Sequence, residues 1–302
     1  MDLDERRPIG GSGLRVPPLC IGMAEIGSPS VPEDQALAVV QAVLDGPVPF
    51  MDTSASYGDG ESERRIGVVL RERGGLPEGF VLATKADRDL TTRDFSGDQA
   101  RRSVERSLRL LGLDHLQLVY LHDPEFATQS FEELTGAGGA VQALLGLQRE
   151  GVIGVVGFAS GPSELVTRYV DTGAFAAAII HNRYTLLERS AEQLFPVAAA
   201  HGTAVLNAAP YGGGLLAKGP REHPRYMYRP ASTEFLRRAE QMAEACARYD
   251  VPLAAAALQF SLREPHVTST IVGFSRADRL QRTIELAQLP VPNALWAELN
   301  EI

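Results

Sequence analysis

The sequence alternates short apolar runs with longer segments of helical spacing, and this alternation limits the fold more than any other feature. In the helical segments apolar residues recur on one face, as Val104, Leu108 and Leu111 do within 96–112. The short runs are rich in leucine or β-branched residues and are bounded by Gly, Pro or Asp, which is typical of buried strands. Eight runs have this character: 18–23, 48–52, 80–85, 116–122, 152–160, 175–181, 203–208 and 267–274.

Eight strands alternating with helices predict either a doubly wound sheet or a closed (β/α)8 barrel. The even spacing of the strands and the lack of a break in composition favour the barrel. A Rossmann domain would need a G-x-G-x-x-G turn after its first strand, and none follows here. The opening stretch 7–17 has apolar positions around Gly-Ser-Gly, which indicates a β-hairpin that caps the barrel floor. We therefore expect a single α/β domain over 1–302, a (β/α)8 TIM barrel.

Charge and composition argue against several classes of partner. The chain has 38 acidic and 29 basic residues, a net charge of −9, whereas surfaces that bind nucleic acid or anionic membranes need a basic excess. Its two cysteines, Cys20 and Cys246, suggest neither a disulfide framework nor a metal site. The charged start argues against a signal peptide, and no apolar stretch approaches the roughly 18 residues of a membrane span. We expect a cytoplasmic protein, monomeric by default, without a metal, whose partner is a small molecule.

Ionisable residues stand at the ends of three successive predicted strands. Asp52 ends the second strand, Lys85 the third and His122 the fourth, and Tyr57 lies in the loop after the second. Taken singly, each suits an ordinary turn, cap or solvent-facing position. In a barrel, however, the carboxyl ends of the strands meet at one face, where active sites are built. The coincidence therefore predicts a catalytic set.

These residue types suit proton transfer at an oxygen atom. The phenol of Tyr57 would ordinarily have a pKa of about 10, which is too high for acid–base catalysis near neutral pH. A neighbouring ammonium, that of Lys85, favours the phenolate and lowers this pKa, while Asp52 keeps the ammonium charged. His122 would orient a carbonyl or hydroxyl group or help to relay the proton. Since none of these groups supplies a hydride, a nicotinamide cofactor is the expected companion.

Three stretches resemble the signature of the aldo-keto reductases: FMDTSASYGDGESERRIG at 50–67, ATK at 83–85 and YLHDPE at 120–125. The resemblance covers nearly the whole chain. It implies a (β/α)8 barrel that uses NADP(H), less often NAD(H), to interconvert carbonyls and alcohols. On the same basis Tyr57 is the general acid/base, and Asp52, Lys85 and His122 complete a tetrad.

The loops after the last two strands have the character of a nucleotide site. PYGGGLLAKGP after the seventh strand offers three consecutive glycines, where a backbone can approach a ligand closely. After the eighth strand, 273–275 should open a helix whose amides favour an anion, with arginines at helical intervals. The resemblance places the adenosine phosphate here, which favours NADP(H) with NAD(H) as an alternative. The cofactor contacts expected from it are Gly22, Met23, Tyr211, Gly212, Gly214, Gly273, Phe274, Ser275, Arg276, Arg279 and Thr283.

Several positions depart from the family pattern. Thr283 stands where many members have an asparagine, Ser160 replaces another asparagine, and His181 replaces a glutamine. The nicotinamide carboxamide must therefore be held differently, by Ser160, His181 or Asn182. The stretch 182–217 is similar to a bacterial subgroup, the D-threo-aldose or L-fucose dehydrogenases and the pyridoxal dehydrogenases, in which a hydroxyl group is oxidised and Tyr57 would act as the base.

The rim of the pocket is expected to be aromatic and apolar. The substrate contacts predicted for it are Ala24, Phe126, Tyr226 and Tyr228. Such walls suit either the face of a sugar or a hydrophobic carbonyl compound. For Tyr226 and Tyr228, packing within their own loop is an equal alternative.

Three functions remain open. An NADP-preferring oxidoreductase acting on an aldose, aldehyde or ketone would use the whole tetrad. A nicotinamide-binding regulatory subunit would need the binding site but no proton donor. An isomerase or dehydratase would use the same acid–base pair without net redox, and the altered residues near the nicotinamide leave room for it.

Overall fold

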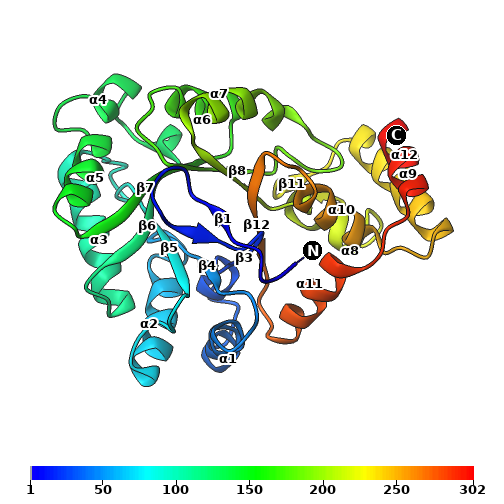
Figure 1. Cartoon of the computed structure of the whole chain (residues 1–302), viewed down its shortest axis with the longest axis horizontal. Coiled ribbons are helices and arrows are strands. Elements are labelled where there is room, and N and C mark those ends of the chain that lie inside the picture. Colours follow the sequence, from blue (N-terminus) through cyan, green and yellow to red (C-terminus); the bar gives the residue numbers. More distant parts are fainter. Residues whose placement is uncertain (1) are drawn as a thin grey trace.

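A closed barrel of parallel strands forms the centre of the computed structural model, which describes residues 2–302 (Figure 1). The barrel strands follow chain order, and the last closes against the first. They are β3 (Leu19–Gly22), β4 (Phe50–Asp52), β5 (Val81–Ala86), β6 (Leu116–His122), β7 (Ile153–Ser160), β8 (Ala177–His181), β9 (Ala204–Ala208) and β12 (Val267–Gly273). The predicted (β/α)8 barrel is confirmed, and each of its eight strands lies where the sequence predicts one.

Helices surround the barrel (Figure 1). They are α1 (Glu33–Leu44), α2 (Glu61–Arg73), α3 (Gly97–Leu111), α4 (Phe131–Thr135), α5 (Ala140–Arg149), α6 (Ser163–Val170), α7 (Leu194–His201), α8 (Leu215–Lys218), α9 (Thr233–Arg248), α10 (Leu253–Leu262), α11 (Asp278–Gln288) and α12 (Asn293–Glu301). Several of them, such as α3, α5 and α10, pack against the barrel strands, whereas α9 and α12 pack against each other at the edge of the molecule (Figure 1). Local signals explain the helix ends: in α3 the side chain of Ser96 accepts a hydrogen bond from the Gln99 amide, and Gly112 stops the helix with φ 71°.

Successive strand residues alternate between two apolar cores. On β6, Leu118 and Tyr120 belong to the cluster inside the barrel, whereas Val119 and Leu121 pack with the surrounding helices. The inner cluster is made of side chains from all eight strands, so the barrel is a packed core and not a channel. This alternation decides which residues at the strand ends point toward the barrel axis.

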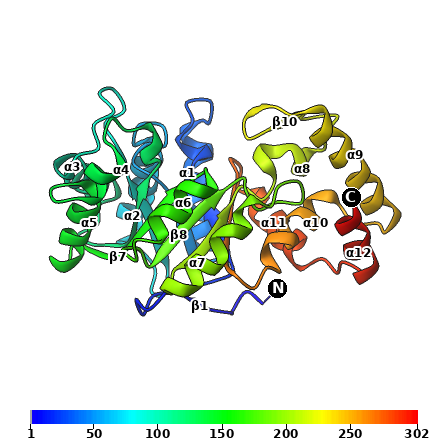
Figure 2. The ribbon, with the colours of Figure 1, turned by 90° about the horizontal axis from the view of Figure 1, so that it is seen from above.

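The amino-terminal hairpin closes one end of the barrel. It consists of β1 (Arg7–Pro8) and β2 (Arg15–Val16), and Ile9 and Val16 are fully buried in the inner cluster. Arg7 donates a hydrogen bond of 2.9 Å to the carbonyl of Val267, where β12 begins. The predicted cap on the barrel floor is therefore present, and Figure 2 shows it at the lower edge of the molecule.

The long loop after β9 lies at the opposite end of the barrel. Within it β10 (Arg225–Tyr226) and β11 (Arg229–Pro230) form a second hairpin, at the upper edge of Figure 2. The carboxyl ends of the strands open toward this side. None of the helices within residues 2–302 is long and apolar enough to cross a membrane.

Candidate active site

Three ionisable side chains meet at the carboxyl end of the barrel because each occupies an inward-facing position on its strand. They are those of Asp52, Lys85 and His122. Each lies two residues beyond a residue of the inner cluster, namely Phe50, Ala83 and Tyr120. The three polar side chains therefore continue the inward-facing column of their strands at its last position. All three are buried, with 4%, 2% and 7% of their surface exposed.

The ammonium of Lys85 joins the carboxylate and the phenol. It donates to Asp52 Oδ2 at 2.5 Å, to the main-chain oxygen of Thr53 at 2.7 Å, and to Tyr57 Oη at 3.1 Å. A lysine ammonium has three protons to donate, so its capacity is fully used. The loop after β4 thus brings Tyr57 into contact with Lys85, one of the residues with which the sequence analysis groups it.

Two glycines set the path of the loop that carries Tyr57. Gly58 has φ 64°, and a Cβ on it would lie 2.0 Å from the carbonyl oxygen of Gly27. A Cβ on Gly27 would in turn lie 2.7 Å from the carbonyl oxygen of Tyr57. Only glycine allows this contact together with a left-handed backbone. Gly58, which follows Tyr57 in the signature, is therefore needed for this close packing, and the packing sets the position of the phenol.

Burial changes the acid–base properties of Tyr57 and Lys85. Burial raises the pKa of Tyr57 to about 12, although the charge of Lys85 partly opposes this. Burial lowers the pKa of Lys85, but Asp52 and Tyr57 outweigh it and hold that pKa above its ordinary value. The expectation that Lys85 brings the tyrosine pKa below its ordinary value was wrong for this structure, because desolvation of the phenolate is the larger effect.

His122 has a partner that the sequence analysis missed. Its Nδ1 lies 2.7 Å from Oδ1 of Asp87, a buried residue just beyond β5. Burial lowers the pKa of His122, but the charges of Asp87 and Asp123 raise it above its ordinary value. The signal was available, because Asp87 follows Lys85 by two residues and so continues the inward-facing column of β5.

The residues predicted to hold the nicotinamide carboxamide lie at the ends of β7 and β8. The hydroxyl of Ser160 is engaged, since it donates to Glu125 Oε1 at 2.8 Å. The Asn182 side chain donates to His181 Nδ1 at 3.0 Å. Asn182 is 1% exposed, and its Oδ1 has no hydrogen-bond partner within residues 2–302. Of the three, Asn182 therefore offers the clearest unmet hydrogen bond.

The anion site predicted after the last barrel strand is built differently from the expectation. Strand β12 continues to Gly273, and α11 begins only at Asp278, so the stretch 273–275 is the end of the strand and the loop after it, and not the start of the helix. Arg276 precedes the helix and pairs with Asp278 at 2.7 Å. Thr283 is buried, and its hydroxyl donates to the carbonyl of Arg279 one turn earlier.

The arginines of this segment differ in their ion pairs. Arg276 is paired with Asp278, and Arg282 lies 3.3 Å from Glu285, as suits a solvated helix face. Arg279 is exposed and forms no ion pair within residues 2–302. Its guanidinium is therefore free to meet a phosphate. Of the remaining predicted contacts here, Phe274 is buried and Ser275 accepts a hydrogen bond of 2.6 Å from Gln35.

The glycines after β9 serve the neighbouring hairpin. Gly212, Gly213 and Gly214 all have positive φ, and a Cβ on Gly212 would lie 2.1 Å from the ring of Tyr226. Tyr226 is buried, and its hydroxyl donates to the carbonyl of Asn182 at 3.0 Å. Tyr228, by contrast, is 63% exposed. Of the two roles considered for Tyr226, packing within its own loop therefore fits this structure. Its ring packs against the glycine turn at Gly212.

The remaining predicted contacts occupy the rim in different ways. Gly22 ends β3, and Met23 is fully buried, with its amide bonded to the Asp52 carbonyl at 2.8 Å. Ala24 is exposed, and Phe126 is 52% exposed with the guanidinium of Arg88 5.0 Å from its ring centre. Tyr211 is half-buried, and burial raises its pKa above the ordinary range.

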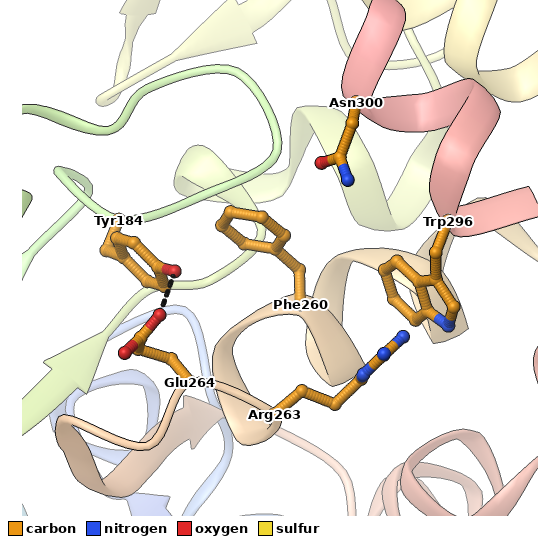
Figure 3. A pocket seen from close by; sticks show the side chains of 6 residues that line it. All are labelled: Tyr184, Phe260, Arg263, Glu264, Trp296 and Asn300. Carbon is orange, nitrogen blue, oxygen red and sulfur yellow. Dashed lines mark hydrogen bonds between the residues drawn. The ribbon is translucent and has the colours of Figure 1, made fainter. Parts of the chain in front are cut away.

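A separate hollow of about 200 Å³ lies beside α10 and α12 (Figure 3). Most of its polar groups have partners: Tyr184 donates to Glu264 at 2.7 Å, Arg263 lies 4.2 Å from the ring of Trp296, and Asn300 accepts from Arg189 at 3.2 Å. None of its lining residues belongs to the predicted site. The complete lining is Tyr184, Phe260, Arg263, Glu264, Trp296 and Asn300. We attribute no chemistry to this hollow.

The residues at the barrel mouth fit a nicotinamide nucleotide. The buried, unpartnered Oδ1 of Asn182 can accept a hydrogen bond from a carboxamide. The unpaired Arg279 can meet a phosphate at the other end. A closed (β/α)8 barrel with ionisable side chains at the carboxyl ends of its strands is typical of an enzyme.

Comparisons with known proteins identify the family. The Aldo/keto reductase family matches residues 18–302. The chain is 34% identical to D-threo-aldose 1-dehydrogenase of a Pseudomonas species, over 96% of this chain and 95% of that one. It is 27% identical to pyridoxal 4-dehydrogenase of Microbacterium luteolum, over 98% and 96%. A solved aldo-keto reductase of Bacillus halodurans, in its holo form, shares the fold with a TM-score of 0.80 at 24% identity, over 98% of this chain and 95% of that one.

The chain belongs to the aldo/keto reductase family. It is an oxidoreductase for the interconversion of carbonyls and alcohols, and enzymes of this family generally use nicotinamide cofactors. The resemblance to the aldose and pyridoxal dehydrogenases is likewise confirmed.

Proposed function

We propose that the protein is an NADP(H)-preferring oxidoreductase in which Tyr57 is the general acid/base. The observation that carries the proposal is the buried Lys85, which bonds Asp52 at 2.5 Å and Tyr57 at 3.1 Å. This arrangement fixes the phenol at the barrel mouth beside a permanent positive charge. Such a pair suits proton exchange with the oxygen of a carbonyl or alcohol.

In this proposal each residue of the tetrad has its own task. The nicotinamide ring, when bound, supplies or accepts the hydride. Tyr57 is protonated near neutral pH, where it donates this proton to the carbonyl oxygen in reduction. Lys85 stabilises the phenolate that remains, and Asp52 holds the lysine in place. In oxidation the same groups act in reverse.

The preference for NADP(H) rests on Arg279. A guanidinium is a strong partner for the additional phosphate of NADP(H), and Arg279 is exposed without an ion pair within residues 2–302. Arg276 and Ser275 lie in the loop directly before α11, the helix that carries Arg279, and are the further contacts we propose. NAD(H) remains the alternative cofactor, since Arg276 is already paired with Asp278.

The substrate we propose is an aldose or a related hydroxy-aldehyde. Support comes from the similarity to the D-threo-aldose enzyme, which covers nearly all of both chains. Acidic side chains lie near the proposed proton-transfer site, among them Asp123 and Glu125, and carboxylates accept hydrogen bonds from sugar hydroxyls. Exposed Phe126 and Tyr228 offer aromatic faces at the rim.

The test follows nicotinamide absorbance with NADP⁺ and NAD⁺ over a panel of aldoses, pyridoxine-type alcohols and, in reverse, simple aldehydes. Tyr57→Phe should lower kcat by about 100-fold or more, the usual effect of losing a general acid/base. Tyr249→Phe is the matched control, because Tyr249 is half-buried on the outside of the barrel and its hydroxyl makes no hydrogen bond within residues 2–302. It should retain full activity.

Each contrary outcome points to a different function. Full activity in Tyr57→Phe would contradict the role of this tyrosine. Turnover without consumption of either cofactor would indicate an isomerase or dehydratase. A biological effect that survives Tyr57→Phe unchanged would indicate a regulatory subunit. Equal kcat/KM with NAD⁺ and NADP⁺ would contradict the cofactor preference alone.

A further inference from the structure

Asp87 makes contacts with two parts of the active site at once. Its Oδ1 lies 2.7 Å from Nδ1 of His122, at the end of β6. Its Oδ2 accepts hydrogen bonds from the hydroxyl of Ser54 at 2.5 Å and from the amide of Ser56 at 2.9 Å, in the loop after β4. Ser56 is the residue directly before Tyr57. One carboxylate therefore links the imidazole to the turn that carries the phenol.

The main chain of Asp87 is itself held firmly. Its amide donates to the hydroxyl of Ser103 at 3.0 Å, and its carbonyl accepts from the side chain of Gln99 at 3.3 Å. Both partners belong to α3, which packs against the barrel. With 3% of its surface exposed, Asp87 has little freedom to move. A carboxylate anchored on both sides is suited to orient other groups.

We propose that Asp87 is a positioning residue that orients the His122 imidazole through Nδ1 and ties it, through Ser56, to the turn that carries Tyr57. The inference rests on the proposed function, since His122 and Tyr57 are the groups that would meet the substrate oxygen. An ionised carboxylate only accepts hydrogen bonds, so it holds the Nδ1 proton in place. The other nitrogen, Nε2, forms no hydrogen bond within residues 2–302 and is left for the substrate.

This arrangement sets what His122 offers at each pH. When protonated, its Nε2–H donates to a carbonyl oxygen, and when neutral, with Nδ1–H held by Asp87, its Nε2 accepts from a hydroxyl group. Asp87 stabilises the protonated form, so the donor persists to higher pH. The charged and titratable groups facing the imidazole are Asp52, Tyr57, Lys85, Asp87, Asp123, Glu125 and His181.

The test is a pH titration of the six histidines by NMR on the full chain, with the His122 signals assigned from a His122→Gln variant. In the wild type we expect a neutral His122 with its proton on Nδ1 and a pKa above about 6.5. Asp87→Asn, which keeps the side-chain volume, should lower that pKa by about one unit or more, a tenfold loss of proton affinity. The matched control is Asp123→Asn, which alters a carboxylate 3.6 Å from Nε2 without removing a hydrogen bond. It should give a smaller shift and leave the proton on Nδ1.

The pH dependence of kcat/KM is a second test, because it should not change if Asp87 has only a structural role. In Asp87→Asn the alkaline limb of kcat/KM for carbonyl reduction should shift to lower pH by the same amount as the His122 pKa, while KM for the cofactor stays unchanged. A neutral wild-type His122 with its proton on Nε2, or with an ordinary pKa, would overturn the proposal. Equal effects of Asp87→Asn and Asp123→Asn would do so as well.

Two features keep the result decisive. Because the wild-type titration needs no substitution at Asp87, it decides the matter even if Asp87→Asn fails to fold. Because the titration needs no substrate, a wrong assignment of Tyr57 would leave its outcome unaffected.

Discussion

At the scale of single residues, the position of a side chain within the barrel governs its chemistry as strongly as its nearest partner does. Lys85 lies 3.1 Å from Tyr57 Oη, and its charge alone would lower the pKa of the phenol. The pKa is nevertheless raised to about 12, because the phenolate would lose more solvation than the ammonium restores. Tyr57 is therefore protonated at neutral pH, and Lys85 is the group placed to stabilise the phenolate when that proton leaves.

Glu63 is a second residue whose environment controls its ionisation. It lies on α2, and its Oε1 accepts a hydrogen bond of 2.5 Å from Thr84 of β5, whereas Oε2 is buried without a partner. Burial raises its pKa from 4.5 to about 7. Since the folded protein binds this proton more tightly than the unfolded chain, stability falls as pH rises from about 4.5 to 7.

Replacing Glu63 should therefore stabilise the protein at higher pH. A shift of this size costs the wild type about 3 kcal/mol once Glu63 is ionised, and Glu63→Gln avoids the cost. We expect the free energy of unfolding of Glu63→Gln, relative to wild type, to grow between pH 5 and pH 8 in urea titrations.

The control for this prediction lies on the same helix. The pKa of Glu61 is lowered by its hydrogen bond with Arg64, so Glu61 stabilises the fold above its ordinary pKa of about 4.5 and loses that effect only as pH falls below it. Glu61→Gln should show no gain between pH 5 and pH 8. A constant difference between Glu63→Gln and wild type over this range would contradict the prediction.

At the scale of secondary-structure elements, the signature stretch also contains the contact between α2 and α3. Gly67 lies on α2, and a Cβ there would be 1.9 Å from the carbonyl oxygen of Leu110 on α3. A helical glycine normally costs stability, so its presence needs a packing reason. Here the absent side chain lets α2 approach the main chain of α3 at Leu110.

Gly67→Ala should accordingly separate the two helices. The steric conflict is with main-chain atoms, which cannot turn away as a side chain does, so we expect a loss of about 1–3 kcal/mol in the free energy of unfolding. Gly11→Ala is the matched control, because a Cβ on Gly11 meets nothing within 4 Å. If urea denaturation gave the same stability for both variants, the helix contact would not need glycine.

At the scale of the whole molecule, the two ends of the barrel have different tasks. The hairpin of β1 and β2, at the lower edge of Figure 2, seals the floor with Ile9 and Val16. The proposed proton-transfer site lies at the other end, where Asp52 and His122 end their strands. The packed inner cluster separates the two. Changes at the floor should therefore affect stability without changing the chemistry.

Ile9→Ala tests this separation. Removing a fully buried isoleucine side chain should cost about 2–5 kcal/mol and lower Tm. Below the new transition, kcat and KM per folded molecule should match the wild type. Ile9→Val, which removes a single methylene group, should lose only about 0.5–1.5 kcal/mol. A large change in KM with either variant would mean that the floor is coupled to the site.

The sequence by itself determined the barrel, its floor hairpin, and the placement of Asp52, Lys85 and His122 at one end. These follow from local patterns: apolar runs of strand length, their alternation with helices, and the polar residue at the end of each run. The same patterns placed Tyr57 in the loop above them. Each of these inferences needed only residues close together in the chain.

Only the tertiary structure decided which groups touch and what that contact does. Asp87 and His122 lie 35 positions apart and meet because β5 and β6 are neighbours. Ser160 is bonded to Glu125, and α11 begins at Asp278, beyond the loop where the helix was expected. The pKa of Tyr57 belongs here too, because desolvation depends on everything packed around the phenol and not on the residues beside it in the chain.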